Sequence, residues 1–142
     1  NNKFNISETI ILEIFAGTGN ISYEFASRGS KNITSIDINK KCINFIKSIS
    51  NKFSFNIKTI KKDAFKFLKS CDQNFDIIFA DPPYDIDNRK YEKLVSLIIE
   101  KKLLNNDGVI IIEHSKKNSL KKIIKYSESR EYGECCFSFF IL

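Results

Sequence analysis

The chain has 142 residues, of which 42% are hydrophobic and 28% are charged, values that are ordinary for one globular domain with a single core. The net charge of +6 fits a polyanionic partner without requiring one. No hydrophobic run approaches the roughly 20 residues that span a membrane, so we expect no membrane association.

The four cysteines follow no metal-binding or redox spacing; they are Cys42, Cys71, Cys135 and Cys136. We expect them to be small apolar side chains in a reducing cytoplasm, and we expect no metal site. No signal-peptide pattern opens the chain. Because the sequence holds no methionine and begins a few residues before its first expected strand, we expect a fragment: one domain over residues 1–142 that lacks an N-terminal segment.

The first elements alternate between strand and helix patterns. Residues 10–15 form a hydrophobic run with one acid, which is typical of a buried parallel strand. A loop with two glycines follows at residues 16–20. We expect Asn20 to cap a helix that Gly29 closes and whose pattern includes Ile21, Phe25 and Arg28.

A second strand, residues 33–36, ends at Asp37, and Asn39 is expected to cap the next helix. Helical spacing predicts that this helix buries Cys42, Phe45, Ile46 and Ile49. Residues 53–60 alternate like a third strand. A short helix after Asp63 would place four residues on one face: Ala64, Phe67, Leu68 and Cys71.

Residues 75–80 read as a buried fourth strand, and Asp87 can cap the helix that follows. That helix would turn Tyr91, Leu94, Val95 and Ile98 inward. Residues 105–108 indicate a turn, and residues 109–113 a fifth strand. The rest of the chain predicts a lysine-rich helix over residues 116–125 with Leu120, Ile123 and Ile124, then two strands around Tyr132-Gly133.

Five successive strand–helix repeats predict an α/β fold with a doubly wound, mostly parallel sheet. Such sheets bind ligands at the carboxyl ends of their strands. An acid stands at or near the end of each of the five strands: Glu13, Asp37, Asp63, Asp81 and Glu113. Any one of them could instead cap the next helix. For Asp63, capping the next helix is as good an interpretation as a functional role. For Asp37 capping is a weaker interpretation, because Asn39 is better placed to cap the helix that follows.

The loop Asp81-Pro82-Pro83-Tyr84 follows the fourth strand, which its two prolines end abruptly. The Asp81 carboxylate and the Pro82 carbonyl could each accept one N–H of an exocyclic base amine, which leaves the nitrogen lone pair free to attack an electrophile. Tyr84 could stack on the base. A proline-rich turn with an aspartate cap is the alternative for this motif alone.

The glycine loop indicates a nucleotide ligand. A pyrophosphate would be repelled by Glu13, and Ser22 stands where a dinucleotide motif has its third glycine, which disfavours a nicotinamide-dependent oxidoreductase. S-adenosylmethionine, with a cationic ammonium and a cationic sulfonium, suits an acidic loop. We therefore predict that it contacts Glu13, Phe15, Gly17, Gly19, Asp37, Ile38, Asp63, Ala64 and Asp81.

Within this set, Gly17 and Gly19 would approach the methionine moiety, and Glu13 would orient the loop or the ammonium. Asp37 lies about 20 residues after the glycine loop, where an acid binds ribose hydroxyls in nucleotide-binding folds. Asp63 and the Ala64 backbone would face the adenine.

The chain resembles class I S-adenosylmethionine-dependent methyltransferases, and more closely the bacterial methyltransferases that modify N2 of guanine 966 in 16S ribosomal RNA. The resemblance spans nearly the whole chain. It is carried by residues 12–19, Ser35-Ile36-Asp37, residues 75–84, Glu113-His114-Ser115 and Tyr132-Gly133. A departure is Glu13, where the family usually has aspartate.

The resemblance implies a Rossmann-like, seven-stranded sheet with helices on both faces and an antiparallel last strand. It also implies a cytoplasmic enzyme, which we expect to be a monomer, that transfers methyl from S-adenosylmethionine to a guanine in ribosomal RNA or the small ribosomal subunit. Catalysis would rest on Asp81, Pro82, Pro83 and Tyr84. The Asp-Pro-Pro-Tyr motif is shared with adenine-N6 methyltransferases, so a DNA methyltransferase remains an alternative, as does a catalytically silent RNA-binding module.

Three further residues are candidates for substrate binding. His114 is the only histidine and could line the base pocket, although a hydrogen-bonded structural histidine is the simpler interpretation. Lys116 and Lys117 open a run of five lysines that could contact RNA phosphates. A solvated helix face is the alternative for these lysines.

Overall fold

The computed structural model describes residues 5–83 and 86–142. Seven strands form one sheet in the order β3-β2-β1-β4-β5-β7-β6. The strands are β1 (Ile10–Ile14), β2 (Asn32–Asp37), β3 (Ile57–Lys61), β4 (Phe75–Ala80), β5 (Leu104–Ser115), β6 (Tyr126–Tyr132) and β7 (Cys135–Ile141). The helices are the 3-10 turn η1 (Ile6–Glu8), α1 (Asn20–Ser27), α2 (Lys40–Phe53), α3 (Ala64–Ser70) and α4 (Asn88–Glu100).

The sheet is parallel except at β7. Strands β1 to β5 pair in parallel, whereas β7 lies antiparallel between β5 and β6. The order reverses at β1, because β2 lies on one side of it and β4 on the other. This is the switch point beside which doubly wound sheets bind their ligands. The predicted seven-stranded α/β fold with an antiparallel last strand is confirmed.

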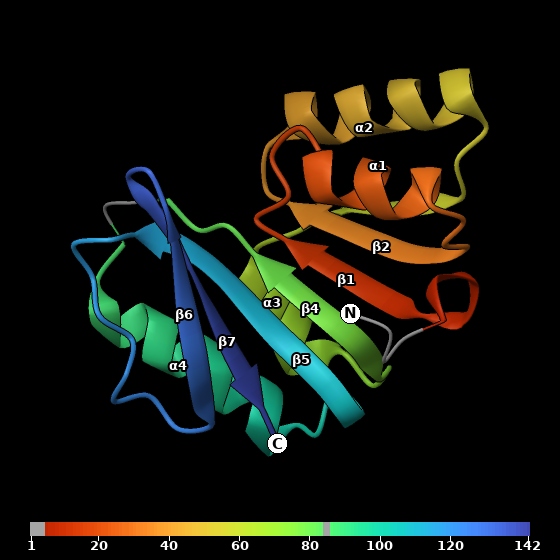
Figure 1. Ribbon diagram of the computed structural model, residues 1–142. Helices are drawn as coiled ribbons and strands as arrows, with labels where there is room; N and C mark the ends of the chain where they lie inside the picture. Colours follow the sequence, from red (N-terminus) through yellow and green to blue (C-terminus); the bar gives the residue numbers. More distant parts are fainter. Residues whose placement is uncertain (1–4, 84–85) are drawn as a thin grey trace.

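Helices cover both faces of the sheet, with α1 and α2 on one face and α3 and α4 on the other (Figure 1). The larger core lies beneath α3 and α4, where Leu68, Tyr91, Leu94 and Ile98 are almost completely buried. The four inward-facing residues predicted for α4 are all buried. This packing fixes α4, and with it the end of the loop that follows β4.

Side chains at the helix starts fix the loops along the carboxyl ends of the strands. Asn39 caps α2 by accepting the N–H groups of Lys41 and Cys42, and Asp87 caps α4, as the sequence predicted. Asp63 accepts the Lys66 N–H and caps α3, which is the structural alternative considered for this acid. The cap of α1 differs from the prediction: it is Gly19, and Asn20 is the first helical residue.

The face predicted to be buried on α2 was only partly right. Ile46 is buried as expected, but the other buried positions are Ile43 and Ser50, while Phe45 is 47% exposed. Residue 53 ends this helix, and the third strand begins only at Ile57. Phe45 instead lines a hollow beside α1 together with Tyr23 and Phe53, so the hydrophobic face of α2 is wider than the stripe that contacts the sheet.

Two predictions in the second half of the chain were wrong. Residues 105–108 belong to β5, where the pairing with β4 shifts register and Asp107 has a φ of 65°. Residues 116–125 form turns and not a helix. Leu120 and Ile123 are nevertheless buried, so these two apolar side chains tie the turns to the core.

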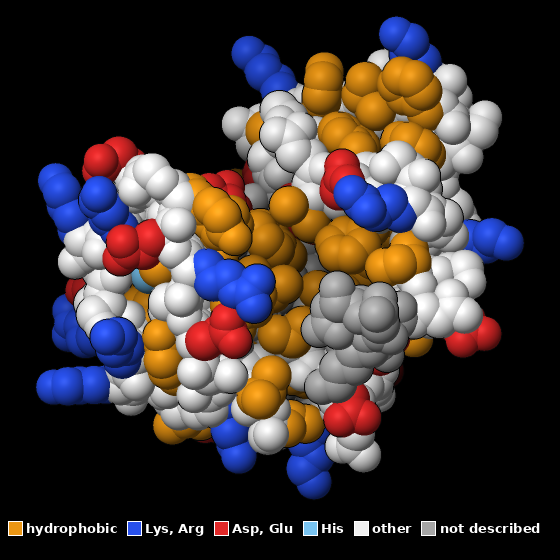
Figure 2. Space-filling model, in the orientation of Figure 1, with side chains coloured by type: hydrophobic (Ala, Val, Ile, Leu, Met, Phe, Trp, Pro, Cys, Tyr) orange, Lys and Arg blue, Asp and Glu red, His pale blue; other side chains and the backbone are white. Residues whose placement is uncertain are grey.

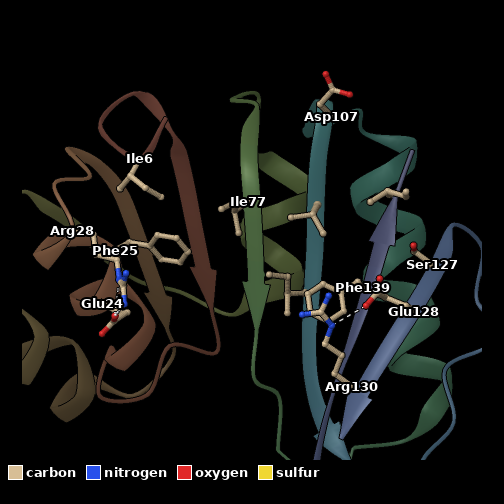
Figure 3. A pocket seen from close by; sticks show the side chains of 13 residues that line it. Ile6, Glu24, Phe25, Arg28, Ile77, Asp107, Ser127, Glu128, Arg130 and Phe139 are labelled. Carbon is tan, nitrogen blue, oxygen red and sulfur yellow. Dashed lines mark hydrogen bonds and ion pairs between the residues drawn. The ribbon is translucent and has the colours of Figure 1, made fainter. Parts of the chain in front are cut away.

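Hydrophobic side chains also gather on the face that carries α1, across the middle of the view in Figure 2. A hollow of about 580 Å³ lies there between α1 and β4, β5, β7 and β6. Phe25, Ile77 and Phe139 point into it, and Glu128 pairs with Arg130 at its far side (Figure 3). No helix within residues 5–83 and 86–142 lies over this part of the sheet.

Candidate active site

A pocket of about 550 Å³ lies at the carboxyl ends of β1, β2, β4 and β5, where the topology predicts a ligand. We call it the carboxyl-edge pocket. It is lined by Glu13, Phe15, Ala16, Gly17, Thr18, Asn20, Ile21, Asp37, Ile38, Phe79, Asp81, Pro83 and Glu113. Its walls therefore combine four acids with backbone and apolar groups.

The glycine loop joins β1 to α1 along one wall of this pocket. The Ala16 N–H donates to the Ile36 carbonyl at 3.0 Å, and the Gly19 N–H donates to the Ala16 carbonyl at 2.9 Å. Gly17 has a φ of 58°, and a Cβ placed on it would meet nothing within 4 Å. The Gly17 backbone is thus open to the pocket, as close approach of a ligand requires.

Gly19 has a different role from the one that the sequence suggested. It does not line the carboxyl-edge pocket. Its φ is 82°, and a Cβ there would lie 2.9 Å from Ile46 Cγ1 and 3.1 Å from the Tyr23 ring. Gly19 therefore lets α1 pack closely against α2.

Glu13 is 3% exposed and is held at the start of α1. Its Oε1 accepts the Ser22 N–H at 3.0 Å and the Ser22 hydroxyl at 2.7 Å. Burial raises the pKa of Glu13 to about 7, against the lowering effect of these hydrogen bonds, and the negative charge of Asp81 adds to the rise. Near neutral pH the Glu13 carboxyl is therefore only partly ionised, and a cation in the pocket would stabilise its charged form.

Asp37 connects the glycine loop to the end of β2. Its two carboxylate oxygens accept the N–H groups of Gly17 and Asn39, each at 2.8 Å. A carboxylate has lone pairs beyond these two bonds, so Asp37 can also accept from hydroxyl groups. Ile38, which follows it, is 63% exposed and lies on the same wall.

A smaller hollow adjoins the carboxyl-edge pocket and shares its lining by Phe15, Asp37 and Ile38. Asp63 and Ala64 line this hollow and not the larger pocket. Phe15 stands between the two spaces with a φ of 53°, and its ring packs edge-on against Phe65. The residues assigned to the adenine therefore lie beside those assigned to the ribose.

The loop after β4 forms the opposite wall. The Asp81 N–H donates to the Ile14 carbonyl at 3.4 Å, and the Ile86 N–H donates to the Pro83 carbonyl at 3.0 Å. Pro82 is buried, and no described residue donates a hydrogen bond to its carbonyl. Tyr84, the predicted stacking residue, lies outside the described residues.

Asp81 is exposed at the mouth of the carboxyl-edge pocket. Partial desolvation raises the pKa of its carboxyl to about 6, and repulsion from Glu113 adds to the rise. Burial also raises the pKa of Glu113, which lines the same pocket. The sequence placed Glu113 among the strand-end acids but assigned it no role, because only the register of β4 against β5 brings it next to Asp81.

His114 faces away from the carboxyl-edge pocket. It is 1% exposed, its Nε2 lies 2.7 Å from the Ser138 hydroxyl, and its ring packs edge-on against Tyr91 of α4. Burial lowers its pKa, although the contact with the Ser115 carbonyl opposes this. This position fits the structural interpretation of His114 rather than the predicted contact with the base.

Lys116 and Lys117 are exposed in the turn after β5. Lys116 lies 3.6 Å from Glu134 across this edge, and the Lys117 N–H donates to the Ser115 hydroxyl. The other lysines of the run are exposed as well: Lys121, Lys122 and Lys125. All five belong to a turn segment instead of the predicted helix.

Three features of residues 5–83 and 86–142 bear on the predictions about metal sites, membrane spans and cysteines. No group of three or more histidine, cysteine, aspartate or glutamate side chains is arranged to hold a metal ion within these ranges. No described helix is long and apolar enough to cross a membrane. Cys42, Cys71, Cys135 and Cys136 are free thiols.

Comparison with known proteins places the chain in a family. Ribosomal RNA small subunit methyltransferase D of Buchnera aphidicola subsp. Baizongia pistaciae is 35% identical over 120 residues, which are 84% of this chain and 59% of that protein. The chain thus spans less than two thirds of the relative's length. The name of this relative agrees with the family resemblance seen in the sequence.

Solved structures show the same fold. A conserved hypothetical protein of Streptococcus pyogenes has a TM-score of 0.85 at 22% identity, covering 94% of this chain and 85% of that one. Magnesium protoporphyrin IX methyltransferase of Synechocystis PCC 6803, solved with bound S-adenosylmethionine, has a TM-score of 0.75 at 11% identity, covering 95% and 70%. The family model described as Conserved hypothetical protein 95 matches residues 2–141, and the chain belongs to this family.

Proposed function

We propose that this chain is the catalytic domain of a methyltransferase that transfers methyl from S-adenosylmethionine to the exocyclic N2 of a guanine in small-subunit ribosomal RNA. The observation that carries the proposal is the wall after β4. There Asp81 and Pro83 line an acidic pocket, and no described residue donates a hydrogen bond to the Asp81 carboxylate or to the carbonyl of Pro82, which lies between them. The relative from Buchnera is named for the same RNA.

The residues of the carboxyl-edge pocket fit S-adenosylmethionine. Four acidic side chains line it, which suits a ligand with two cationic groups and opposes a pyrophosphate. The open backbone of Gly17 would hold the methionine moiety, and Glu13 and Asp81 would stabilise its positive charge. Asp37 would accept the ribose hydroxyls, and Asp63 with Ala64 would border the adenine in the adjoining hollow.

The cofactor supplies a methyl group on a sulfonium: the carbon–sulfur bond breaks as the carbon–nitrogen bond forms, and sulfur keeps the electron pair. The protein's part is to prepare the attacking amine. Asp81 and the Pro82 carbonyl would each accept one N–H of N2, which turns the nitrogen lone pair toward the methyl group. After transfer the nitrogen carries a positive charge and is strongly acidic, so its proton passes to Asp81 or to water.

The target guanine must leave its base stack to reach this loop. We propose that Tyr84 stacks on the extruded base and that Lys116 and Lys117 contact nearby phosphates. The net charge of +6 favours such a polyanion. We further propose that the protein acts as a monomer on the small ribosomal subunit in the cytoplasm.

The central role of Asp81 can be tested by substitution. Asp81→Ala removes an acceptor that acts on the amine, so transfer should fall by roughly 100- to 1,000-fold or more. The affinity for S-adenosylhomocysteine, measured by calorimetry, should stay within about threefold, because this product has no sulfonium charge for Asp81 to stabilise and the other acids and the glycine loop hold the rest of it. Asp72→Ala, at an exposed position before β4, is the matched control and should leave both quantities unchanged.

Retention of transfer in Asp81→Ala would refute the mechanism. Failure of the unaltered protein to bind S-adenosylhomocysteine would refute the assignment of the pocket, and would favour the catalytically silent RNA-binding module.

A further inference from the structure

Glu113 stands directly beside Asp81. Strands β4 and β5 are parallel, and Ala80 is paired with Ile112. Asp81 follows Ala80, and Glu113 follows Ile112. Successive side chains point to opposite faces of a sheet. Both therefore point to the face opposite Ala80 and Ile112, and both line the carboxyl-edge pocket. Repulsion from Glu113 is one cause of the raised pKa of Asp81, which agrees with this neighbouring position.

These two carboxylates differ from the other acids of the pocket. Glu13 is bonded to Ser22, and each oxygen of Asp37 accepts a backbone N–H. Among the described residues, by contrast, no hydrogen-bond donor or cation contacts the side chain of Asp81 or Glu113. Two neighbouring carboxylates repel each other, and a ligand that presents two adjacent hydrogen-bond donors would stabilise both.

Guanine presents such a pair of donors. Its N1–H and N2–H groups are neighbours on one edge of the base, and a side-chain carboxylate is a pure acceptor. Adenine carries a lone pair on N1 next to its exocyclic amine. A carboxylate facing that lone pair would be repelled, so a pair of carboxylates favours guanine and rejects adenine.

We propose that Glu113 is the residue that sets base specificity, by accepting the N1–H of the extruded guanine while Asp81 accepts an N2–H. The proposal rests on the proposed function and adds to it the means of choosing the base. Glu113 is thereby distinguished from the acids around the cofactor. The rival role for Glu113 is to hold the ammonium of the cofactor, and the experiment below separates the two.

The test compares guanine with 2-aminopurine at the target position of an RNA substrate. 2-Aminopurine keeps the exocyclic amine but has a lone pair in place of N1–H. The unaltered protein should prefer guanine by at least about 100-fold in kcat/KM, because the N1 acceptor faces a carboxylate. In Glu113→Gln the amide can donate to that lone pair, so the preference should fall at least about tenfold.

The comparison of preferences cancels the difference in intrinsic reactivity between the two bases. Glu92→Gln, on the exposed side of α4, is the control and should keep the preference of the unaltered protein. The affinity for S-adenosylhomocysteine should change by less than about threefold in Glu113→Gln. These three results together would support the proposal.

An unchanged preference in Glu113→Gln would overturn it. So would a loss of cofactor affinity without a change in preference, which would assign Glu113 to the ammonium. If the unaltered protein transferred no methyl to guanine, the proposed function itself would fail, and the role of Glu113 would fall with it. An active protein with an unchanged preference would reject the role of Glu113 alone.

Discussion

Single residues in the carboxyl-edge pocket have distinct physical tasks. Glu13 is buried and fixes the start of α1 through Ser22, whereas Asp81 and Glu113 stand at the pocket mouth without a donor among the described residues. Gly17 exposes its backbone to the pocket, and Gly19 makes room for Ile46. Acids and glycines that look equivalent in the sequence therefore differ in whether they pack against neighbouring elements or line the pocket.

Gly19→Ala should be more destabilising than an alanine at another glycine with positive φ. At Gly19 the left-handed backbone costs about 1–2 kcal/mol, and the clash with Ile46 adds about 1–3 kcal/mol. Gly133→Ala is the matched control, since its φ is 60° and a Cβ there would meet nothing within 4 Å. Urea unfolding would measure both, and an equal loss in the two variants would contradict the packing role of Gly19.

Glu13→Gln should change stability in a pH-dependent way. Folding raises the pKa of Glu13 from 4.5 to about 7, so its protonated form is favoured in the folded state. The stability that it contributes is full below the unfolded pKa of 4.5 and is lost as pH rises through about 7. Glutamine stays neutral, so the variant should gain roughly 3 kcal/mol relative to the unaltered protein between about pH 4.5 and about pH 8.

Urea unfolding of both proteins across this range checks the prediction for Glu13. Glu92→Gln serves as the exposed control and should show a constant difference from the unaltered protein. If the difference in unfolding free energy between Glu13→Gln and the unaltered protein were also independent of pH, burial would not raise the pKa of Glu13.

At the scale of elements, the strand ends and the caps that follow them bring the chemistry together. Strand β4 stops at Ala80, Asp81 and the two prolines follow it, and Asp87 caps α4. Residues 116–125 form the segment that follows β5. It consists of turns that Leu120 and Ile123 hold against the core, which leaves its lysines exposed.

Replacing Lys116, Lys117 and Lys121 by glutamine should weaken RNA binding and reduce its salt dependence. If each lysine neutralises one phosphate, the slope of log K against log salt should decrease in magnitude by about 2 to 3. Glutamine at Lys31, Lys101 and Lys102 is the control, because these exposed lysines precede β2 and β5 at the opposite edge of the sheet. Binding titrations at several salt concentrations measure the slope, and an unchanged slope in the first variant would reject the contact.

At the scale of the whole molecule, the fold class could be predicted from the sequence more fully than the details at the edges of the sheet. The alternation of strands and helices and the buried face of α4 were evident because they depend on local periodicity. The helix expected over residues 116–125 did not form, since its lysine spacing and its three apolar residues fit turns anchored at two points equally well. Periodicity reports which side chains are buried, and not which structure buries them.

The candidate site was also predicted only in part. The acids and the glycine loop were found because they stand at strand ends, and they do gather at one edge. The role of Gly19 and the neighbour of Asp81 could not be found, because both depend on contacts between distant segments. The packing of Gly19 needs the position of α2, and the pairing of Asp81 with Glu113 needs the register of β4 and β5.

The most direct test of the central claim is to identify the methylated nucleoside. The purified protein with its natural termini would receive methyl-labelled S-adenosylmethionine with unmodified small ribosomal subunits or, separately, with duplex DNA, and the products would be digested to nucleosides. We predict that the label appears in N2-methylguanosine from the ribosomal RNA. Label in N6-methyladenine from the DNA, or in neither product, would contradict the proposed function.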